Sequence, residues 1–159
     1  MDARLLRSAA LGIIAIARQF GVRITADTID NAIERGNLNN PDQLENTLSA
    51  LGVTTQLRRI KPKDLQNRSY YYPCVALLKD GSSRIVATRT TDDNHLPAFI
   101  CIDPLDPSSA SETIGEGEFL AAWSGLLFLV AKRTGQEAQD RFFDWRWFLP
   151  ELFRYKWLL

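Results

Sequence analysis

The first fifty residues carry apolar side chains at helical spacing. Between positions 4 and 20 the apolar residues fall three and four apart, at Leu6, Ala9, Ala10, Ile13, Ala17 and Phe20. This spacing predicts an amphipathic helix, and Gly21 can end it. Thr25 and Asn40 are residue types that cap helix N-termini, and each precedes a further helical pattern. We therefore expect three helices before residue 53.

After residue 52 the pattern changes to short strand-like runs. Strands are predicted at 53–57, 73–78, 84–89, 98–102 and 126–130, with one helical turn at 61–65 and a short helix at 118–123. Asp80-Gly81 suits a tight hairpin, because this pair tolerates positive φ. Segments 90–97 and 104–117 are expected loops, being polar or rich in Pro, Ser and Gly. Three helices followed by an antiparallel sheet predict an α+β domain.

Composition bounds the class of protein. The 159 residues are 45% hydrophobic and 24% charged, which suits one domain with a sizeable core and an appendage. Nineteen basic residues balance nineteen acidic ones, which argues against a nucleic-acid partner. Cys74 and Cys101 lie in strand-like runs and are expected to be buried, reduced thiols. No metal-ligand cluster or nucleotide motif is found, so neither a metal nor another cofactor is expected.

The C-terminal segment 142–159 has a composition of its own. It holds half of the chain's aromatic residues, among them Trp145, Trp147 and Trp157, interleaved with Arg and Lys. Trp and Tyr gather where an apolar phase meets water, and Lys and Arg lay their stems along the same boundary. One interpretation is a segment at the membrane surface before a first spanning helix. The other is an amphipathic helix packed on its own domain.

Several short motifs occur in a recognisable order. The most specific is Glu118-Phe119-Leu120-Ala121-Ala122-Trp123-Ser124-Gly125, followed by an apolar strand. Others are Leu51-Gly52-Val53, Tyr72-Pro73-Cys74-Val75-Ala76 and Ile102-Asp103-Pro104. In this order the chain resembles the papain-like cysteine peptidase domain at the N-terminus of bacteriocin-exporting ABC transporters. The resemblance implies a papain-like fold over 1–133, with 134–159 as linker and pre-transmembrane segment.

Within that family, the tail resembles exporters of hemolysin-type RTX proteins in type I secretion systems. The matching segment is Phe143-Asp144-Trp145-Arg146-Trp147-Phe148-Leu149-Pro150. The resemblance implies an N-terminal domain of an integral transporter, on the cytoplasmic face of the bacterial inner membrane. Its expected partners are the rest of the ABC transporter, a membrane fusion protein, an unfolded RTX-type secreted protein and, through the tail, the membrane surface.

The resemblance also assigns catalytic positions. Counting back from Gly21, the nucleophile position falls on Ser8 and the oxyanion-binding Gln position on Asp2. The His position after the hairpin glycine falls among Ser82, Ser83 and Arg84, so no imidazole is expected there. The orienting acid is Asp103, which also suits a turn before Pro104.

The chain's single histidine, His95, lies in a loop outside the family's position. With Ser8, Ser83 and Asp103 as degenerate positions, the sequence predicts a domain that is not an enzyme. The expected role is docking of the unfolded passenger before export. Two alternatives remain open at this point: a leader peptidase with Ser8 as an atypical nucleophile, and a purely structural transporter module.

Candidate passenger contacts are the consecutive aromatics Tyr70, Tyr71 and Tyr72, because tyrosine suits contact with mobile polypeptide. The alternative is that members of this run face the core at the start of a strand. The hairpin tip at 79–84 and the loop at 90–97 are second candidates.

Overall fold

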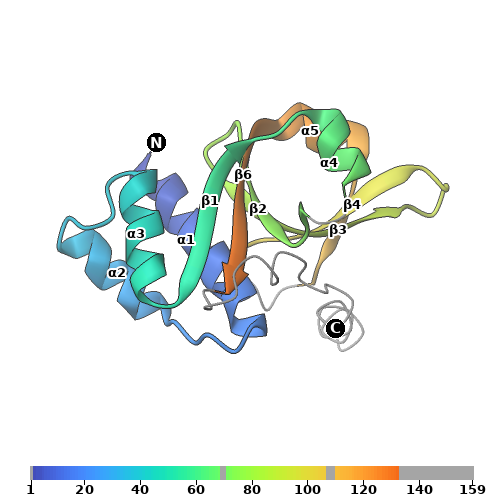
Figure 1. The fold of residues 1–159 in the computed structure, drawn as a ribbon. Helices are drawn as coiled ribbons and strands as arrows, with labels where there is room; N and C mark the ends of the chain where they lie inside the picture. Colours follow the sequence, from blue (N-terminus) through green and yellow to red (C-terminus); the bar gives the residue numbers. More distant parts are fainter. Residues whose placement is uncertain (1, 69–70, 107–109, 133–159) are drawn as a thin grey trace.

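The protein is described here as a computed structural model that covers residues 2–68, 71–106 and 110–132 (Figure 1). In these ranges the chain forms five helices and six strands. In order they are α1 Ala3–Gln19, α2 Ala26–Glu34, α3 Pro41–Ala50, β1 Val53–Arg59, α4 Pro62–Asn67, β2 Cys74–Leu78, β3 Ser83–Thr91, β4 Pro97–Ile102, β5 Glu112–Gly115, α5 Glu116–Ala122 and β6 Trp123–Lys132. The predicted α+β class is confirmed.

Helices α2 and α3 begin at the caps that the sequence predicted, and the structure adds Asp2 as the cap of α1. The Asp2 carboxylate accepts the backbone N–H of Arg4 at the start of α1. Thr25 caps α2, and Asn40 caps α3 by accepting the backbone N–H of Gln43 at 2.9 Å. Each cap satisfies a backbone donor that the first helical turn leaves unpaired.

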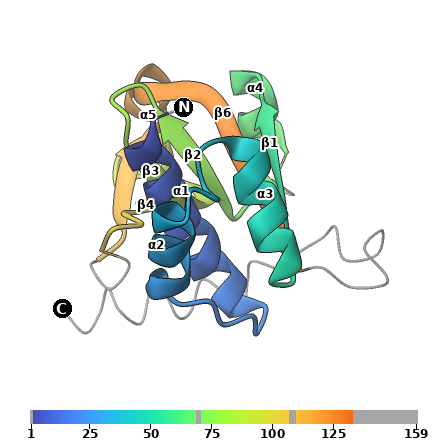
Figure 2. The same cartoon turned by 90° about the vertical axis from the view of Figure 1, so that its left-hand side faces the viewer.

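The strands form one antiparallel sheet in the order β1-β6-β2-β3-β4-β5. Helix α1 packs on β2, β3 and β6, with α2 and α3 on the same side of the sheet (Figure 2). Helices α4 and α5 contribute Leu65 and Phe119 to the opposite face. Because neighbouring residues of a strand point to opposite faces, β2 can serve both layers.

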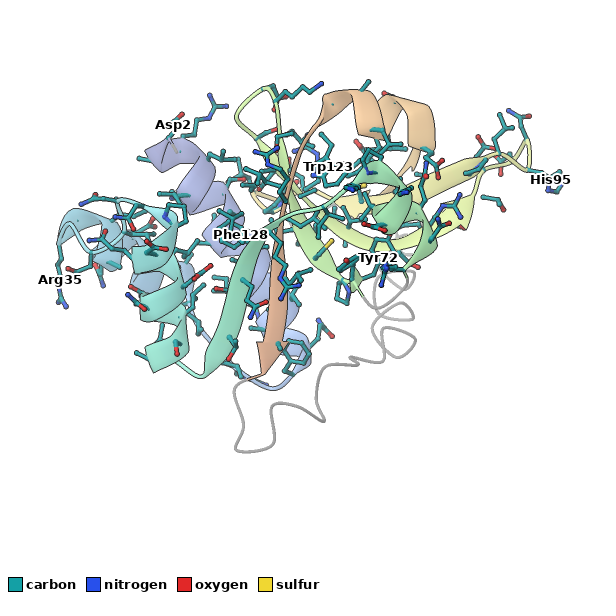
Figure 3. The ribbon with its side chains drawn as sticks, turned by 45° about the horizontal axis from the view of Figure 1, so that its top comes forward. Asp2, Arg35, Tyr72, His95, Trp123 and Phe128 are labelled. Atoms are coloured by element: carbon teal, nitrogen blue, oxygen red, sulfur yellow. The ribbon has the colours of Figure 1, made fainter. Side chains whose placement is uncertain are left out.

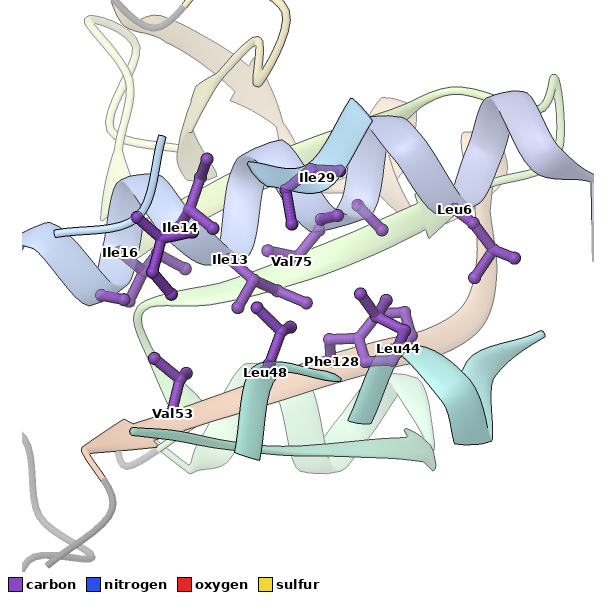
Figure 4. Close-up of a cluster of buried hydrophobic side chains, with 14 of the residues drawn as sticks. Leu6, Ile13, Ile14, Ile16, Ile29, Leu44, Leu48, Val53, Val75 and Phe128 are labelled. Atoms are coloured by element: carbon purple, nitrogen blue, oxygen red, sulfur yellow. The ribbon is translucent and has the colours of Figure 1, made fainter. Parts of the chain in front are cut away.

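The larger core lies between the N-terminal helices and the sheet. Ile13 of α1, Leu48 of α3, Val75 of β2 and Phe128 of β6 meet there and are fully buried (Figure 4). A second core on the other face contains Cys74, Ala76, Phe99, Phe119 and Trp123, among others. The Phe99 and Phe119 rings pack at 4.8 Å between centroids.

The structure corrects the prediction at two places. The expected loop at 104–117 contains β5, whose four residues were missed because none of their side chains is buried and they show no apolar face. The expected loop at 90–97 is shorter, since β3 runs to Thr91 and β4 begins at Pro97. In the described ranges no helix is both long and apolar enough to cross a membrane. The predicted tail segment 134–159 lies outside the described residues.

Gly12 sets how closely α1 approaches the sheet. A Cβ atom at this position would lie 3.1 Å from Val75 Cγ2 and 3.4 Å from Ile85 Cγ1. We expect Gly12→Val to destabilise the fold by about 1–3 kcal/mol, since an overpacked core must shift. Urea denaturation measures the loss.

Arg18→Val is the matched control, because it places the same side chain on an exposed position of α1. This control should stay within about 0.5 kcal/mol of the parent protein. Equal losses in the two variants would show that β-branching in the helix, and not contact with the sheet, is responsible.

Candidate functional site

The site is built around Ser8 on α1 and Ser83 at the start of β3. Ser8 lies one helical turn before Gly12, on the helix face that meets the sheet. The two hydroxyl oxygens are 2.5 Å apart, although 75 residues separate them in sequence. Ser8 is 4% exposed and Ser83 is fully buried. Among the three candidates after Gly81, the structure therefore brings Ser83 to the predicted nucleophile position.

Asp103 follows β4 directly and lies near the same end of the sheet. Ile85 pairs with Ile102, so the register carries Asp103 to the level of Arg84. The Asp103 carboxylate accepts the backbone N–H of Leu105 at 3.0 Å, and its carbonyl accepts that of Asp106. This geometry is the turn that the sequence predicted before Pro104.

Two other sequence candidates lie apart from the serine pair. Asp2 caps α1 and is exposed. His95 lies at the tip of the β3–β4 hairpin, with a φ of 62° and its backbone N–H donated to Asp92 (Figure 3). Within the described residues, the hydrogen-bond partner of Ser8 is thus a hydroxyl and not an imidazole.

An ion pair borders the site. The Arg7 guanidinium on α1 donates to Asp30 on α2 at 2.8 Å. This contact lowers the pKa of Asp30, chiefly through the hydrogen bond. Both side chains are about two-fifths exposed, at 42% and 40%, so the pair orients α2 more than it stabilises the fold.

Both cysteines are free and buried, as the sequence predicted. They lie in the second core, behind the sheet from Ser8. Burial raises the pKa of Cys101 from 9.0 to about 12, because the apolar surroundings disfavour a thiolate. Burial raises the pKa of Cys74 as well. Among the described residues no group of three or more metal-ligating side chains is gathered.

The tyrosine run meets the core. Tyr72 is 3% exposed, and its hydroxyl donates to the carbonyl of Leu65. Tyr71 is half-buried against the same cluster, and Tyr70 lies outside the described residues. The alternative that members of this run face the core is therefore confirmed for Tyr72. Trp145, Trp147 and Trp157 also lie outside the described residues.

An open pocket of about 460 Å³ lies beside Tyr72. Its lining combines amide and hydroxyl groups with about as much apolar surface, from Gln66, Asn67, Tyr72, Thr88, Arg89, Thr90 and Thr91. Glu116 holds one wall together, because it accepts from Gln66 Nε2 at 2.6 Å and from Arg89 Nε at 2.9 Å. No sequence pattern predicts this pocket, since its walls come from α4, from β3 and from Tyr72, two residues before β2.

The fold and the position of Ser8 point to one family. A model of the Peptidase C39 family matches residues 7–135. The chain belongs to the Peptidase C39 family. This match confirms the resemblance to the peptidase domain of ABC transporters that the sequence motifs indicated. No significant match was found among curated protein sequences.

Solved structures with this fold include domains of ABC transporters. One is the N-terminal peptidase C39 like domain of a toxin secretion ATP-binding protein from Vibrio parahaemolyticus, at 20% identity and a TM-score of 0.59, covering 84% of this chain and 99% of that one. Another is the peptidase domain of Streptococcus ComA, a bi-functional ABC transporter in quorum sensing, at 18% identity and a TM-score of 0.62, covering 84% and 95%.

A third solved structure contains a bound peptide. It is a double glycine motif protease from an AMS/PCAT transporter in complex with the leader peptide, at 15% identity and a TM-score of 0.60, covering 84% of this chain and 88% of that one. At these identities the likeness establishes a shared fold.

The expectation that this domain is not an enzyme is wrong. It rested on three motif positions, Asp2, Ser8 and Ser83, where the family's Gln, Cys and His are missing. The family match runs from residue 7 to 135 and places the chain in a peptidase family. Substitutions at these positions do not outweigh a family match over most of the chain. The pseudoenzyme interpretation is therefore withdrawn.

The serine pair predicts a coupled loss of stability. Ser8→Ala leaves the buried Ser83 hydroxyl without its partner, which costs about 1–3 kcal/mol. The double variant Ser8→Ala/Ser83→Ala should lose less than the sum of the single variants. Ser82→Ala is the control, because its hydroxyl bonds Asp80 at the surface. Chemical denaturation measures all four, and additive losses would contradict a direct Ser8–Ser83 bond.

The buried thiols predict a pH dependence. The folded-state pKa of Cys101 lies above its usual 9.0, so the folding stability it contributes is intact below pH 9 and falls as pH rises toward 12. The loss approaches about 1.4 kcal/mol per pH unit for each thiol. Urea midpoints between pH 8 and 11 measure the slope, which Cys101→Ala should reduce. An unchanged slope would show that other groups control the alkaline loss.

Proposed function

We propose that this chain is the N-terminal domain of an ABC transporter of type I secretion. In this proposal it binds an unfolded RTX-type secreted protein at the cytoplasmic face of the bacterial inner membrane. Residues 1–133 form the peptide-binding domain, and 134–159 link it to the membrane-spanning part. The remaining partners are the rest of the transporter, a membrane fusion protein and the membrane surface near Trp145, Trp147 and Trp157. The proposal concerns binding, whether or not the bound chain is also cut.

The observation that carries this proposal is the shared C39 fold. The chain covers 99% of a C39-like domain from a toxin secretion ATP-binding protein, and the same fold holds a leader peptide in a transporter protease. Both relatives belong to transport systems, and the second binds polypeptide through this scaffold. A polypeptide is therefore the partner class that the fold supports best.

The surface chemistry supports the same partner class. The pocket beside Tyr72 exposes polar and apolar surface in nearly equal amounts, and its one guanidinium is already paired with Glu116. Such a lining suits the amide groups of an extended chain better than it suits a strongly charged ligand. Tyr72 lies in the wall of this pocket, and Tyr71 precedes it in the chain. Together with Tyr70, both remain the proposed passenger contacts.

A binding assay tests the proposal. An RTX-type secreted protein is labelled and titrated with this domain, once unfolded without calcium and once folded with calcium. We expect saturable binding of the unfolded form, with a Kd on the order of 1–100 μM because ordering a disordered chain opposes association. The folded form should bind at least about tenfold more weakly, since folding removes its extended segments.

An unrelated, permanently unfolded protein of similar length is the control for general stickiness. Binding to neither form of the passenger, or equal binding to the control protein, would contradict the proposal. The same samples are examined by mass spectrometry for cleavage. A specific cut that Ser8→Ala abolishes would add a peptidase step to the binding role, with Ser8 as its nucleophile.

A further inference from the structure

Strand β3 is covered by β2 along only half of its length. The pairing joins Cys74–Leu77 of β2 to Ser83–Val86 of β3. Beyond Val86 the strand continues to Thr91, paired with β4 on its other side. Within the described residues, nothing pairs with residues 87–91 on the side of β2. The residue before β2 is Pro73, which has no N–H to donate.

The hydrogen-bond phase of β3 shows which backbone groups face this open edge. The backbone N–H of Asp92 donates to Leu96, so alternate residues Thr90 and Thr88 also bond toward β4. Arg89 and Thr91 therefore direct their N–H and C=O groups away from β4. Thr91 lies opposite Pro97, which could not have donated to it.

The pocket follows this edge. Its lining includes Thr88 and Thr90, which point to one face of the sheet, and Arg89 and Thr91, which point to the other. A cavity bordered by both sets of side chains lies along the side of the strand and not above one face. The β3–β4 hairpin projects away from the N-terminal helices, so the edge is reached from outside (Figure 1).

From this geometry, and resting on the proposed function, we infer that the open edge of β3 takes up an extended segment of the secreted polypeptide as an added strand. The segment pairs with the N–H and C=O groups of Arg89 and Thr91. Main-chain bonding of this kind gives affinity with little demand on sequence. The hydroxyl and amide lining favours small polar side chains, and a proline at a bonding position is excluded.

A second copy of this chain is a poorer occupant. Five residues of strand extend for about 17 Å, which buries too little surface for a stable dimer on its own. The other sheet edges are also less suited to strand addition. In edge strand β1 the backbone N–H of Leu57 already donates to Glu45 at 3.0 Å, so it is not open to an added strand. Edge strand β5 is only four residues long.

Amide hydrogen exchange on the whole chain, free and bound to the unfolded passenger, tests the inference. In the free chain the amides of Arg89 and Thr91 should exchange quickly, while those of Thr88 and Thr90 are slow. Binding should slow Arg89 and Thr91 by at least about tenfold, since each gains a backbone acceptor. Protection already present in the free chain would overturn the inference, because another part of the chain or a second copy would then hold the edge.

Two substitutions at residue 91 test the same edge. Thr91→Pro removes an outward N–H without breaking the β4 ladder, whereas Thr91→Ala keeps the donor and loses only the side chain. We expect Thr91→Pro to weaken passenger binding at least about tenfold, and Thr91→Ala to stay within about threefold. Circular dichroism checks folding of both variants.

The outcomes separate the two proposals. If the parent chain does not bind the passenger, the proposed function fails. If the parent and Thr91→Pro bind equally well, and exchange at Arg89 and Thr91 is unchanged, the passenger binds elsewhere and only the strand-addition inference fails.

Discussion

The close approach of α1 to the sheet is the constraint on which the larger core and the serine site depend. Gly12 allows it, because the space of a side chain at this position is already occupied by Val75 and Ile85. One turn earlier on the same face, Ser8 comes within hydrogen-bonding distance of Ser83. If α1 moved outward, the core around Ile13 and the serine pair would be lost together. The geometry of the site is therefore a consequence of packing and not of a separate local motif.

This dependence explains what the sequence could predict. The three N-terminal helices are encoded locally, by caps such as Thr25 and Asn40 and by the spacing of apolar residues. Ser8 was placed by counting from Gly21, which needs no tertiary structure. The residue opposite Ser8 could have been any of the three that follow Gly81, namely Ser82, Ser83 and Arg84. Only the sheet register and the position of α1 select Ser83, because a contact across 75 residues leaves no local pattern.

The same reasoning explains what could not be predicted. The tyrosine run gave two interpretations, and for Tyr72 the choice depended on whether Leu65 and Phe99 lie on the same face of the sheet. The short strand β5 was missed because none of its four side chains is buried. The pocket beside Tyr72 could not be predicted from the sequence for another reason. Its walls come from segments that are far apart in sequence. Glu116 connects two of them by hydrogen bonds to Gln66 and Arg89, and such contacts leave no periodic pattern in the sequence.

Strand β3 carries both Ser83 of the buried serine pair and the open edge that is proposed to bind polypeptide. Its first half carries Ser83 beneath α1, where Ser83 is paired with Leu77 of β2, and only Ile85 and Val86 are paired on both sides. The register shift between Val86 and Thr88 leaves Ala87 as an extra residue and reverses which backbone groups face each neighbour. Beyond the shift, β2 has ended and Arg89 is unpaired on that side among the described residues. A single strand thus belongs to a rigid, packed site at one end and presents open hydrogen-bonding groups at the other. A polypeptide bound along the open half, as proposed, would lie on the strand that also carries Ser83.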